Sequence, residues 1–155
     1  MLNRNIKLNQ LTNVIPLNYA VYSKETKVKL YLPSGESGFT KYNTIMSDWV
    51  NTNDKFVEVS ANTLDYLLQS KGIKQGEVNW IKIDVEGAEF EVLKGATNVL
   101  SKSKDIALLI EVHGPDNYRP IMEFLNSYNF IVEFEKTYGT GDKHIVLRKY
   151  DSGKL

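Results

Sequence analysis

Short apolar segments alternate with amphipathic ones from about residue 56 onward, and this alternation constrains the fold more than any other feature. The apolar segments are "KFVEVS", "NWIKID" and "DIALLIEVH", and each is followed by a segment that we interpret as a helix. Two further segments, "FIVEFEKTYG" and "KHIVLRKY", flank turn residues at 139–142 and predict a closing hairpin. The order predicts an α/β sheet, mostly parallel, with helices on both faces and an antiparallel strand at its far edge.

The expected helices have recognisable boundaries. Asn62 or Thr63 can cap the first helix, and Gly72 ends it. The second, "GAEFEVLKGATNVLSKS", is predicted as one continuous helix because its apolar residues recur at helical spacing. The last starts at "DNYRP" and carries Pro120 within its first two turns.

The N-terminal part of the chain is less regular. "NVIPLNYAVYS" is interpreted as an edge strand, because proline cannot donate a hydrogen bond to a sheet. "TKVKLYLP" alternates apolar and polar residues, which predicts a half-buried strand antiparallel to its predecessor. Residues 33–54 are rich in Gly, Ser, Thr and Asn and predict a long loop, either a binding loop or a simple connector.

Composition excludes several classes of function. The 155 residues, of which 42% are hydrophobic, suit one globular domain over residues 1–155. The formal net charge is zero, which favours neither nucleic acid nor an anionic membrane as a partner. The absence of cysteine excludes disulfides and thiolate chemistry. We find no secretory signal, and the longest apolar run, "IALLI", is too short to span a bilayer, so we expect a cytoplasmic protein.

Polar side chains follow two of the expected strands at the point where each strand ends. Asp84 and Glu86 come after "NWIKI", and Glu111 and His113 end "IALLIEVH". Ligands of open α/β sheets bind beyond the carboxyl ends of the strands. If these two strands are neighbours, the four side chains converge on one edge of the sheet. The sequence therefore predicts a functional site there.

Each acid also has a purely structural interpretation. Asp84 or Glu86 can cap the helix that begins near Gly87, and both Glu86 and Glu111 can be solvated at strand ends. Glu89 lies in the first helical turn, where the helix dipole is a sufficient reason for an acid. We therefore leave Glu89 outside the predicted site.

The two histidines have different surroundings. His113 is followed by Gly114 and Pro115, which predicts a strand exit outside the core. Its ordinary pKa near 6.5 suits a general base near neutral pH. His144 is expected to be structural or to face solvent. The spacings D-x-E and E-x-H are compatible with a divalent cation, because residues i and i+2 share one face of a strand, but we assign no metal site.

The segment "IKIDVEGAEFEVLKGA" resembles the signature of the FkbM family of methyltransferases. "VEVSANTLDYLL" is similar to the strand and helix that precede the signature in this family, and "LLIEVHG" is similar to the strand that follows it. "NVIPLNYAVYSKETKVKLYL" is similar to the family's adenine-side strand and to the small strand after it. The resemblance covers roughly residues 5–150. It implies a Rossmann-like class I methyltransferase sheet of order 3-2-1-4-5-7-6, with a C-terminal antiparallel hairpin, and S-adenosylmethionine as cofactor.

The chain departs from the family pattern at its N-terminus. Family members begin with a strand that ends in a D-x-G-A-N-x-G loop for the methionine end of the cofactor, and their second strand ends in an acid for the ribose. Neither is found here, so we expect a truncated domain without the first two strands. "NVIPLNYAV" can then pair with "NWIKID", another chain can fill the gap, or the edge stays exposed. We therefore expect a homodimer or a partner chain that covers the open edge.

The resemblance implies an O-methyltransferase that acts on a hydroxyl of a sugar, a glycan or a small molecule. It places Asp84 and Glu86 at the methyl end of the cofactor and at the acceptor hydroxyl. His113 is the expected general base, with Glu111 orienting His113 or the substrate. The residues expected near the adenine are Asn18, Tyr19 and Ala20. The alternative is a non-catalytic domain, or one half of a split methyltransferase that needs a partner chain to bind the cofactor.

Overall fold

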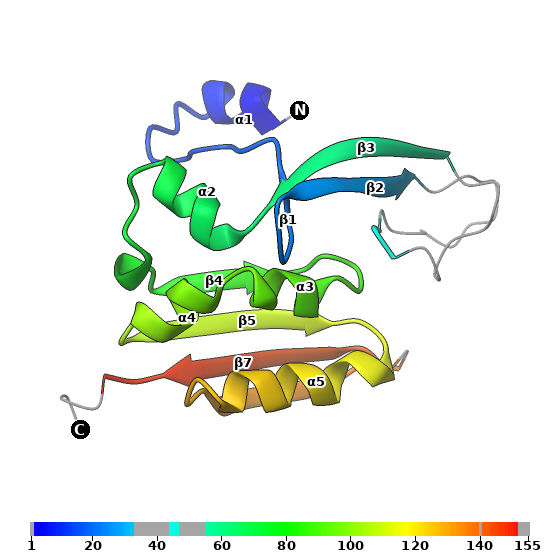
Figure 1. The fold of residues 1–155 in the computed structure, drawn as a ribbon, viewed down its shortest axis with the longest axis vertical. Coiled ribbons are helices and arrows are strands. Elements are labelled where there is room, and N and C mark those ends of the chain that lie inside the picture. The colour runs from blue at the N-terminus through cyan, green and yellow to red at the C-terminus, as the bar shows by residue number, and fades with distance from the viewer. Residues whose placement is uncertain (1, 33–43, 47–54, 140, 152–155) are drawn as a thin grey trace.

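The computed structural model describes residues 2–32, 44–46, 55–139 and 141–151. Most of the loop expected over residues 33–54 therefore lies outside the described residues. The described strands form two separate sheets (Figure 1). The first has the order β1-β3-β2, with β1 at Ala20–Val21, β2 at Thr26–Leu32 and β3 at Lys55–Asn62. The second has the order β4-β5-β7-β6, with β4 at Trp80–Ile83, β5 at Ile106–Val112, β6 at Ile131–Thr137 and β7 at Lys143–Lys149.

Both sheets are mixed, which corrects the expectation of one mostly parallel sheet. β1 pairs parallel with β3 and β4 parallel with β5, whereas the pairs β2–β3, β5–β7 and β6–β7 are antiparallel. The order β4-β5-β7-β6 and the closing hairpin agree with the sequence-based prediction. β4 has β5 as its only strand neighbour within the described part of the chain, so its other edge is open.

The N-terminal strands differ from the prediction in their pairing. Strand β1 is only two residues long, and Val14, Ile15 and Leu17 before it are exposed and irregular. β2 does not pair with β1. Instead β3 lies between them, with Thr26 opposite Ala61 and Leu32 opposite Lys55. The long β2–β3 ladder offers more backbone hydrogen bonds than pairing with a two-residue strand, which explains why the local hairpin is not formed.

The helices from α2 to α5 follow the predicted positions with one break. They are α1 (Leu2–Leu8), α2 (Leu64–Ser70), α3 (Glu89–Lys94), α4 (Thr97–Lys102) and α5 (Pro115–Asn126), and a short 3₁₀ helix spans Gln75–Glu77. Thr63 caps α2 as predicted, because its hydroxyl accepts a hydrogen bond of 3.1 Å from the backbone N–H of Tyr66. No helix among the described residues is long and apolar enough to cross a membrane.

The single helix predicted over residues 87–103 is two helices, α3 and α4. Backbone from the first sheet passes close to the junction: a Cβ added to Gly95 would lie 2.1 Å from the carbonyl oxygen of Tyr22. The N-terminus of α4 is capped from another helix, since the buried Asp65 carboxylate accepts the N–H groups of Asn98 at 2.8 Å and of Val99 at 3.0 Å. Tertiary contacts therefore override the helical periodicity at this point.

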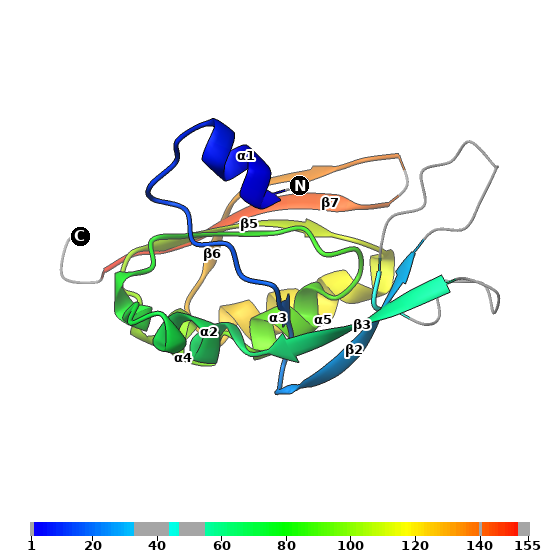
Figure 2. The same ribbon diagram turned by 90° about the horizontal axis from the view of Figure 1, so that it is seen from above.

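The core lies between the second sheet and its helices. Helices α3, α4 and α5 cover the same face of this sheet, and α1 lies on the other side, so the amphipathic helices do not sandwich the sheet as expected (Figure 2). The buried residues of this core include Leu93, Leu100, Ile106, Leu108, Ile110, Ile121, Leu125, Ile145 and Leu147. Burial of β5 under α3 and α5 fixes its carboxyl end beside that of β4, where the predicted site lies.

Candidate functional site

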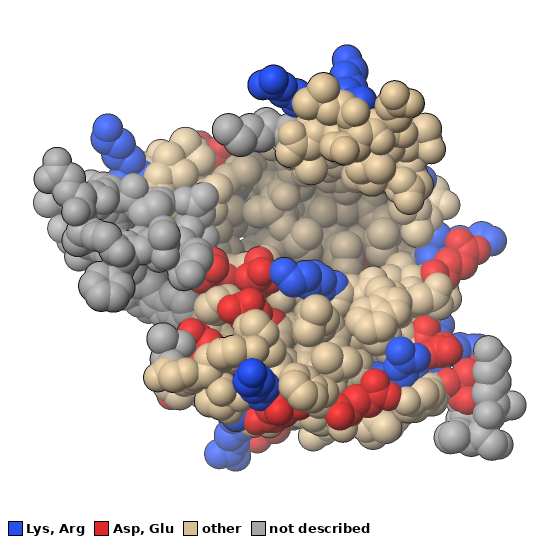
Figure 3. Space-filling model, turned by 180° about the vertical axis from the view of Figure 1, so that it is seen from behind, with Lys and Arg blue, Asp and Glu red and all other residues tan. Residues whose placement is uncertain are grey.

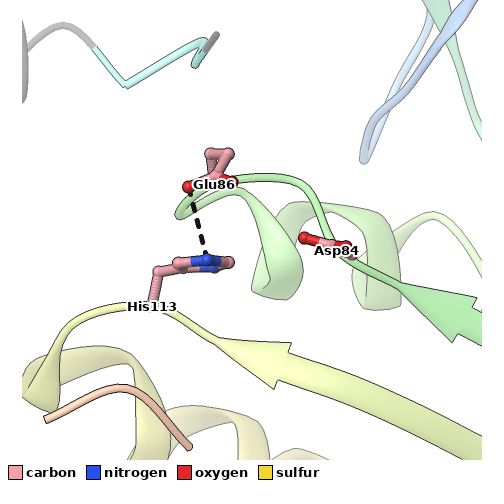
Figure 4. A group of neighbouring side chains, drawn as sticks. All are labelled: Asp84, Glu86 and His113. Atoms are coloured by element: carbon pink, nitrogen blue, oxygen red, sulfur yellow. Dashed lines mark ion pairs between the residues drawn. The ribbon is translucent and has the colours of Figure 1, made fainter. Parts of the chain in front are cut away.

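The carboxyl ends of β4 and β5 lie side by side, as the sequence predicts. The two strands are parallel, with Trp80 opposite Ala107 and Ile83 opposite Ile110. Asp84 therefore emerges next to the end of β5, where Glu111 and His113 are placed. The side chains of Asp84, Glu86 and His113 point toward one another across this edge (Figure 4). The prediction that these residues converge on one edge is confirmed, and we call Asp84, Glu86, Glu111 and His113 the acidic rim.

His113 is the centre of the acidic rim. Its Nε2 atom lies 3.3 Å from Glu86 Oε2 and 3.6 Å from Glu111 Oε1. Its side chain is 9% exposed, which corrects the expectation that His113 lies outside the core. The burial arises because the chain turns into α5 directly after β5, and Asn117 of this helix donates a 2.8 Å hydrogen bond to the carbonyl oxygen of His113.

Glu89 belongs to the site, although the sequence analysis left it out. Its side chain is fully buried, and its Oε1 atom lies 2.7 Å from Nδ1 of His113. The same oxygen accepts a 2.9 Å hydrogen bond from the backbone N–H of Gly87. The signal that could have found it is helical spacing: Val92 and Leu93, three and four residues later, are buried, so Glu89 lies on the core face of α3. An acid on that face requires a buried partner.

The loop between β4 and α3 holds Glu86 in an unusual backbone conformation. Glu86 has φ of 51° and Gly87 has φ of 97°, both in the left-handed region. For a residue with a Cβ this region costs on the order of 1 kcal/mol. The carbonyl oxygen of Glu86 accepts a 2.7 Å hydrogen bond from the hydroxyl of Thr44, which helps to hold this conformation. Such strain at a candidate site is consistent with a functional position for Glu86.

The carboxylates shift the protonation of His113. The hydrogen bond to Glu89 raises the pKa of His113 from 6.5 to about 9; burial opposes this shift, and the charges of Glu89, Glu86 and Glu111 add to it. Burial raises the pKa of Glu86 above its ordinary value, and the charge of His113 partly opposes the rise. His113 is therefore an imidazolium at neutral pH in this state, which corrects the argument from its ordinary pKa.

The acidic rim has two further basic neighbours. Lys82 Nζ lies 2.7 Å from Asp84 Oδ2, and the hydrogen bond and charge of Asp84 raise the pKa of Lys82. His144 of β7 lies 3.2 Å from Glu111 through its Nε2 atom, and its ring packs on Tyr138 at a centroid distance of 4.4 Å. His144, expected to be structural or to face solvent, therefore contacts the rim through Glu111.

The residues expected near the adenine lie elsewhere. Ala20 opens β1 and is paired with Ala61 of β3, in the first sheet, whereas the rim belongs to the second. Asn18 and Tyr19 precede β1 in an irregular exposed segment. The structure thus gathers the four predicted catalytic residues and Glu89, and it places Ala20 on the first sheet, directly after Asn18 and Tyr19. Their contact with the adenine stays a prediction.

The fold and the rim define an α/β protein with a candidate active site at the carboxyl ends of its parallel strands, the position at which this class of fold binds ligands. The chain belongs to the methyltransferase FkbM domain family, whose model matches residues 2–132. The hexuronic acid methyltransferase AglP of Haloferax volcanii is 29% identical to it over 142 residues, which are 89% of this chain and 53% of that protein. The chain thus spans about half the length of this relative. No solved structure is significantly similar to the chain.

Proposed function

We propose that this chain takes part in S-adenosylmethionine-dependent O-methylation of a hydroxyl on a sugar or glycan. The observation that carries the proposal is the buried pair of His113 and Glu89 beneath Glu86, at the carboxyl ends of β4 and β5. Membership of the FkbM family supports methyl transfer. The relative AglP is named for a hexuronic acid, which supports a sugar as the acceptor.

The acidic rim fits the cationic end of this cofactor. The side chains of Asp84 and Glu111 are 35% and 30% exposed, so their carboxylates are open to a ligand. Acidic side chains also gather beside a hollow of the surface on the face shown in Figure 3. When bound, S-adenosylmethionine supplies a methyl group on a positively charged sulfur, and carboxylates attract that charge. Asp84 and Glu86 are the residues that we propose for this contact.

The remaining requirement is removal of the proton from the acceptor hydroxyl. We propose that His113 accepts it at Nε2, the nitrogen that faces the rim, while Nδ1–H donates to Glu89 and fixes the orientation of the ring. Glu111, which contacts both histidines, orients His113 or the substrate. Because its neighbours raise the pKa of His113 to about 9, the imidazole alone is an available base mainly in alkaline solution. The positive sulfur of a bound cofactor would lower that pKa.

A partner chain is the second candidate, on a different observation. β4 has an open edge within the described chain, and Trp80 on this strand is 60% exposed. An unpaired edge presents backbone N–H and C=O groups to another strand. We propose that a second copy or another polypeptide covers this edge. The chain would then be one half of a split methyltransferase, or a domain that binds the acceptor without catalysis.

The proposal is tested by methyl transfer from labelled S-adenosylmethionine to a glycan that contains uronic acid. Label in the glycan is expected with the wild-type chain and a loss of at least 100-fold with His113→Asn. Glu58→Gln, an exposed substitution on β3, is the control and should keep full activity. If His113→Asn transfers methyl groups as fast as the wild type, the assigned base is wrong. If the wild type is inactive alone and active only with a second polypeptide, the split enzyme is the better account.

A further inference from the structure

We propose that Asp84, Glu86 and His113 form a binding site for one divalent metal cation. Each of these residues offers one ligand atom, and the three atoms lie within 4.8 Å of one another. Ligand atoms about 2.1 Å from a shared cation are roughly 3 Å to 3.5 Å apart at the usual angles. His113 Nε2 and Glu86 Oε2, at 3.3 Å, already have this separation. Only Asp84, the most exposed of the three, has to move inward by a rotation of its side chain.

The orientation of His113 is an independent argument for a metal. Its Nδ1 atom is held at 2.7 Å by the fully buried Glu89, which is itself held by the backbone N–H of Gly87 at 2.9 Å. This leaves Nε2 directed at Glu86 and Glu111. Histidines that ligate metals almost always donate their second ring N–H to a carboxylate or carbonyl in this way. A solvated cluster of acids does not require such a buried carboxylate behind the imidazole.

The charges around the site favour a cation. Four carboxylates, those of Asp84, Glu86, Glu89 and Glu111, surround one imidazole. Among the described residues, the basic side chains in contact with these carboxylates are His113 itself, Lys82 at Asp84, and His144 at Glu111. Lys82 is 62% exposed and can leave Asp84 for solvent at little cost, so it competes with a metal without excluding it.

The ligand set indicates the kind of ion. Two carboxylates and one imidazole suit Mn²⁺ or Zn²⁺ better than Mg²⁺ or Ca²⁺, which prefer oxygen ligands alone. Three protein ligands would leave coordination positions open for water. A metal bound at Nε2 would displace the proton that His113 carries at neutral pH and would keep that atom from accepting another. The metal-bound state and the state in which His113 acts as a base are therefore alternatives. Cation binding does not require the proposed methyl transfer, and it can be measured without cofactor or acceptor.

The test is a titration of the metal-free chain with Mn²⁺, in which the electron paramagnetic resonance signal reports free ion. We expect one bound ion per chain. Asp84→Asn and Glu86→Gln should each weaken binding at least 10-fold. Glu89→Gln, which removes the carboxylate behind His113 without removing a ligand, should weaken it about 10-fold to 100-fold. Lys82→Gln should tighten it, because the competing ammonium is gone.

The control is Glu58→Gln, an exposed acid on β3 that pairs with Lys27. It should leave the affinity for Mn²⁺ unchanged. Circular dichroism on every variant checks that the fold is kept, and Asp84→Asn, at the most exposed ligand, tests the site even if Glu89→Gln unfolds. The proposal is overturned if the wild type binds no Mn²⁺ up to millimolar concentration. It is also overturned if Glu58→Gln weakens binding as much as Asp84→Asn.

Discussion

The pair of Glu89 and His113 should make the stability of the fold depend on pH, and Glu89→Gln tests this directly. In the folded state the pKa of His113 is raised from 6.5 to about 9, mainly by the hydrogen bond to Glu89. A raised pKa stabilises the folded state fully below the ordinary pKa of 6.5, and this stabilisation is lost as the pH rises through about 9. At 1.36 kcal/mol per pKa unit, the largest contribution is about 3 kcal/mol to the free energy of unfolding.

Glutamine keeps the size of Glu89 and an acceptor for Nδ1–H, but it removes the charge. We expect Glu89→Gln to lower the free energy of unfolding by at most about 3 kcal/mol at pH 6, since Glu86 and Glu111 still raise the pKa of His113. The loss should be much smaller at pH 10, where His113 is neutral in both proteins. The assay is urea unfolding at both pH values in metal-free buffer. Nuclear magnetic resonance titration of His113, with His144→Gln for assignment, gives its pKa directly.

The control for this experiment is Glu123→Gln, which removes an exposed acid of α5 that pairs with Arg119. Its effect should be under about 1 kcal/mol at either pH. The reasoning is refuted if His113 titrates near 6.5 in the wild type. It is equally refuted if Glu89→Gln destabilises the chain by the same amount at pH 6 and pH 10.

Two other substitutions test the packing that positions the site, and thermal unfolding followed by circular dichroism measures both. Gly95→Ala places a Cβ 2.1 Å from the carbonyl oxygen of Tyr22 and should destabilise the fold by about 3 kcal/mol or more, whereas Gly139→Ala, with open space around it, should have little effect. Equal effects of the two would contradict the close approach. Asp65→Ala removes the cap of α4 and should cost about 2 kcal/mol, because two backbone N–H groups lose their acceptor. An unchanged melting temperature would show that water replaces this cap.

Much of the second sheet could be predicted from the sequence. Its strands are short, apolar and bounded by turn residues, so local pattern determines them. The pairing of β4 with β5 is the usual one for two consecutive strands joined by a helical segment, and it places Asp84 and His113 on one edge of the sheet.

The features that the sequence analysis missed depend on contacts between distant segments. The break between α3 and α4 arises from the approach of Tyr22 to Gly95 and from the cap by Asp65. The spacing of apolar residues along the helix predicts neither contact. The separation into two sheets depends on the pairing of β3 with both β1 and β2. Competition between possible partners decides such pairing, and local preference does not reveal it.

Glu89 was missed for a different reason. An acid in the first turn of a helix has a sufficient local explanation in the helix dipole, and this explanation does not require burial. Its spacing from Val92 and Leu93 placed it on the core face, and this signal was present in the sequence. When an acid lies on the buried face of a helix and a neighbouring strand ends in histidine, the acid is a candidate partner of that histidine.

The most direct test of the central claim, that the acidic rim is the cofactor end of a methyltransferase site, is isothermal titration of the chain with S-adenosylhomocysteine and S-adenosylmethionine. The mass in solution is measured on the same sample, so that a dimer is recognised. The account predicts saturable binding of both compounds, unchanged by Glu58→Gln. Asp84→Asn should weaken S-adenosylmethionine at least 10-fold and S-adenosylhomocysteine, which lacks the positive sulfur, much less. An absence of binding up to millimolar ligand would contradict cofactor binding by this chain alone and would direct the search to a partner along β4.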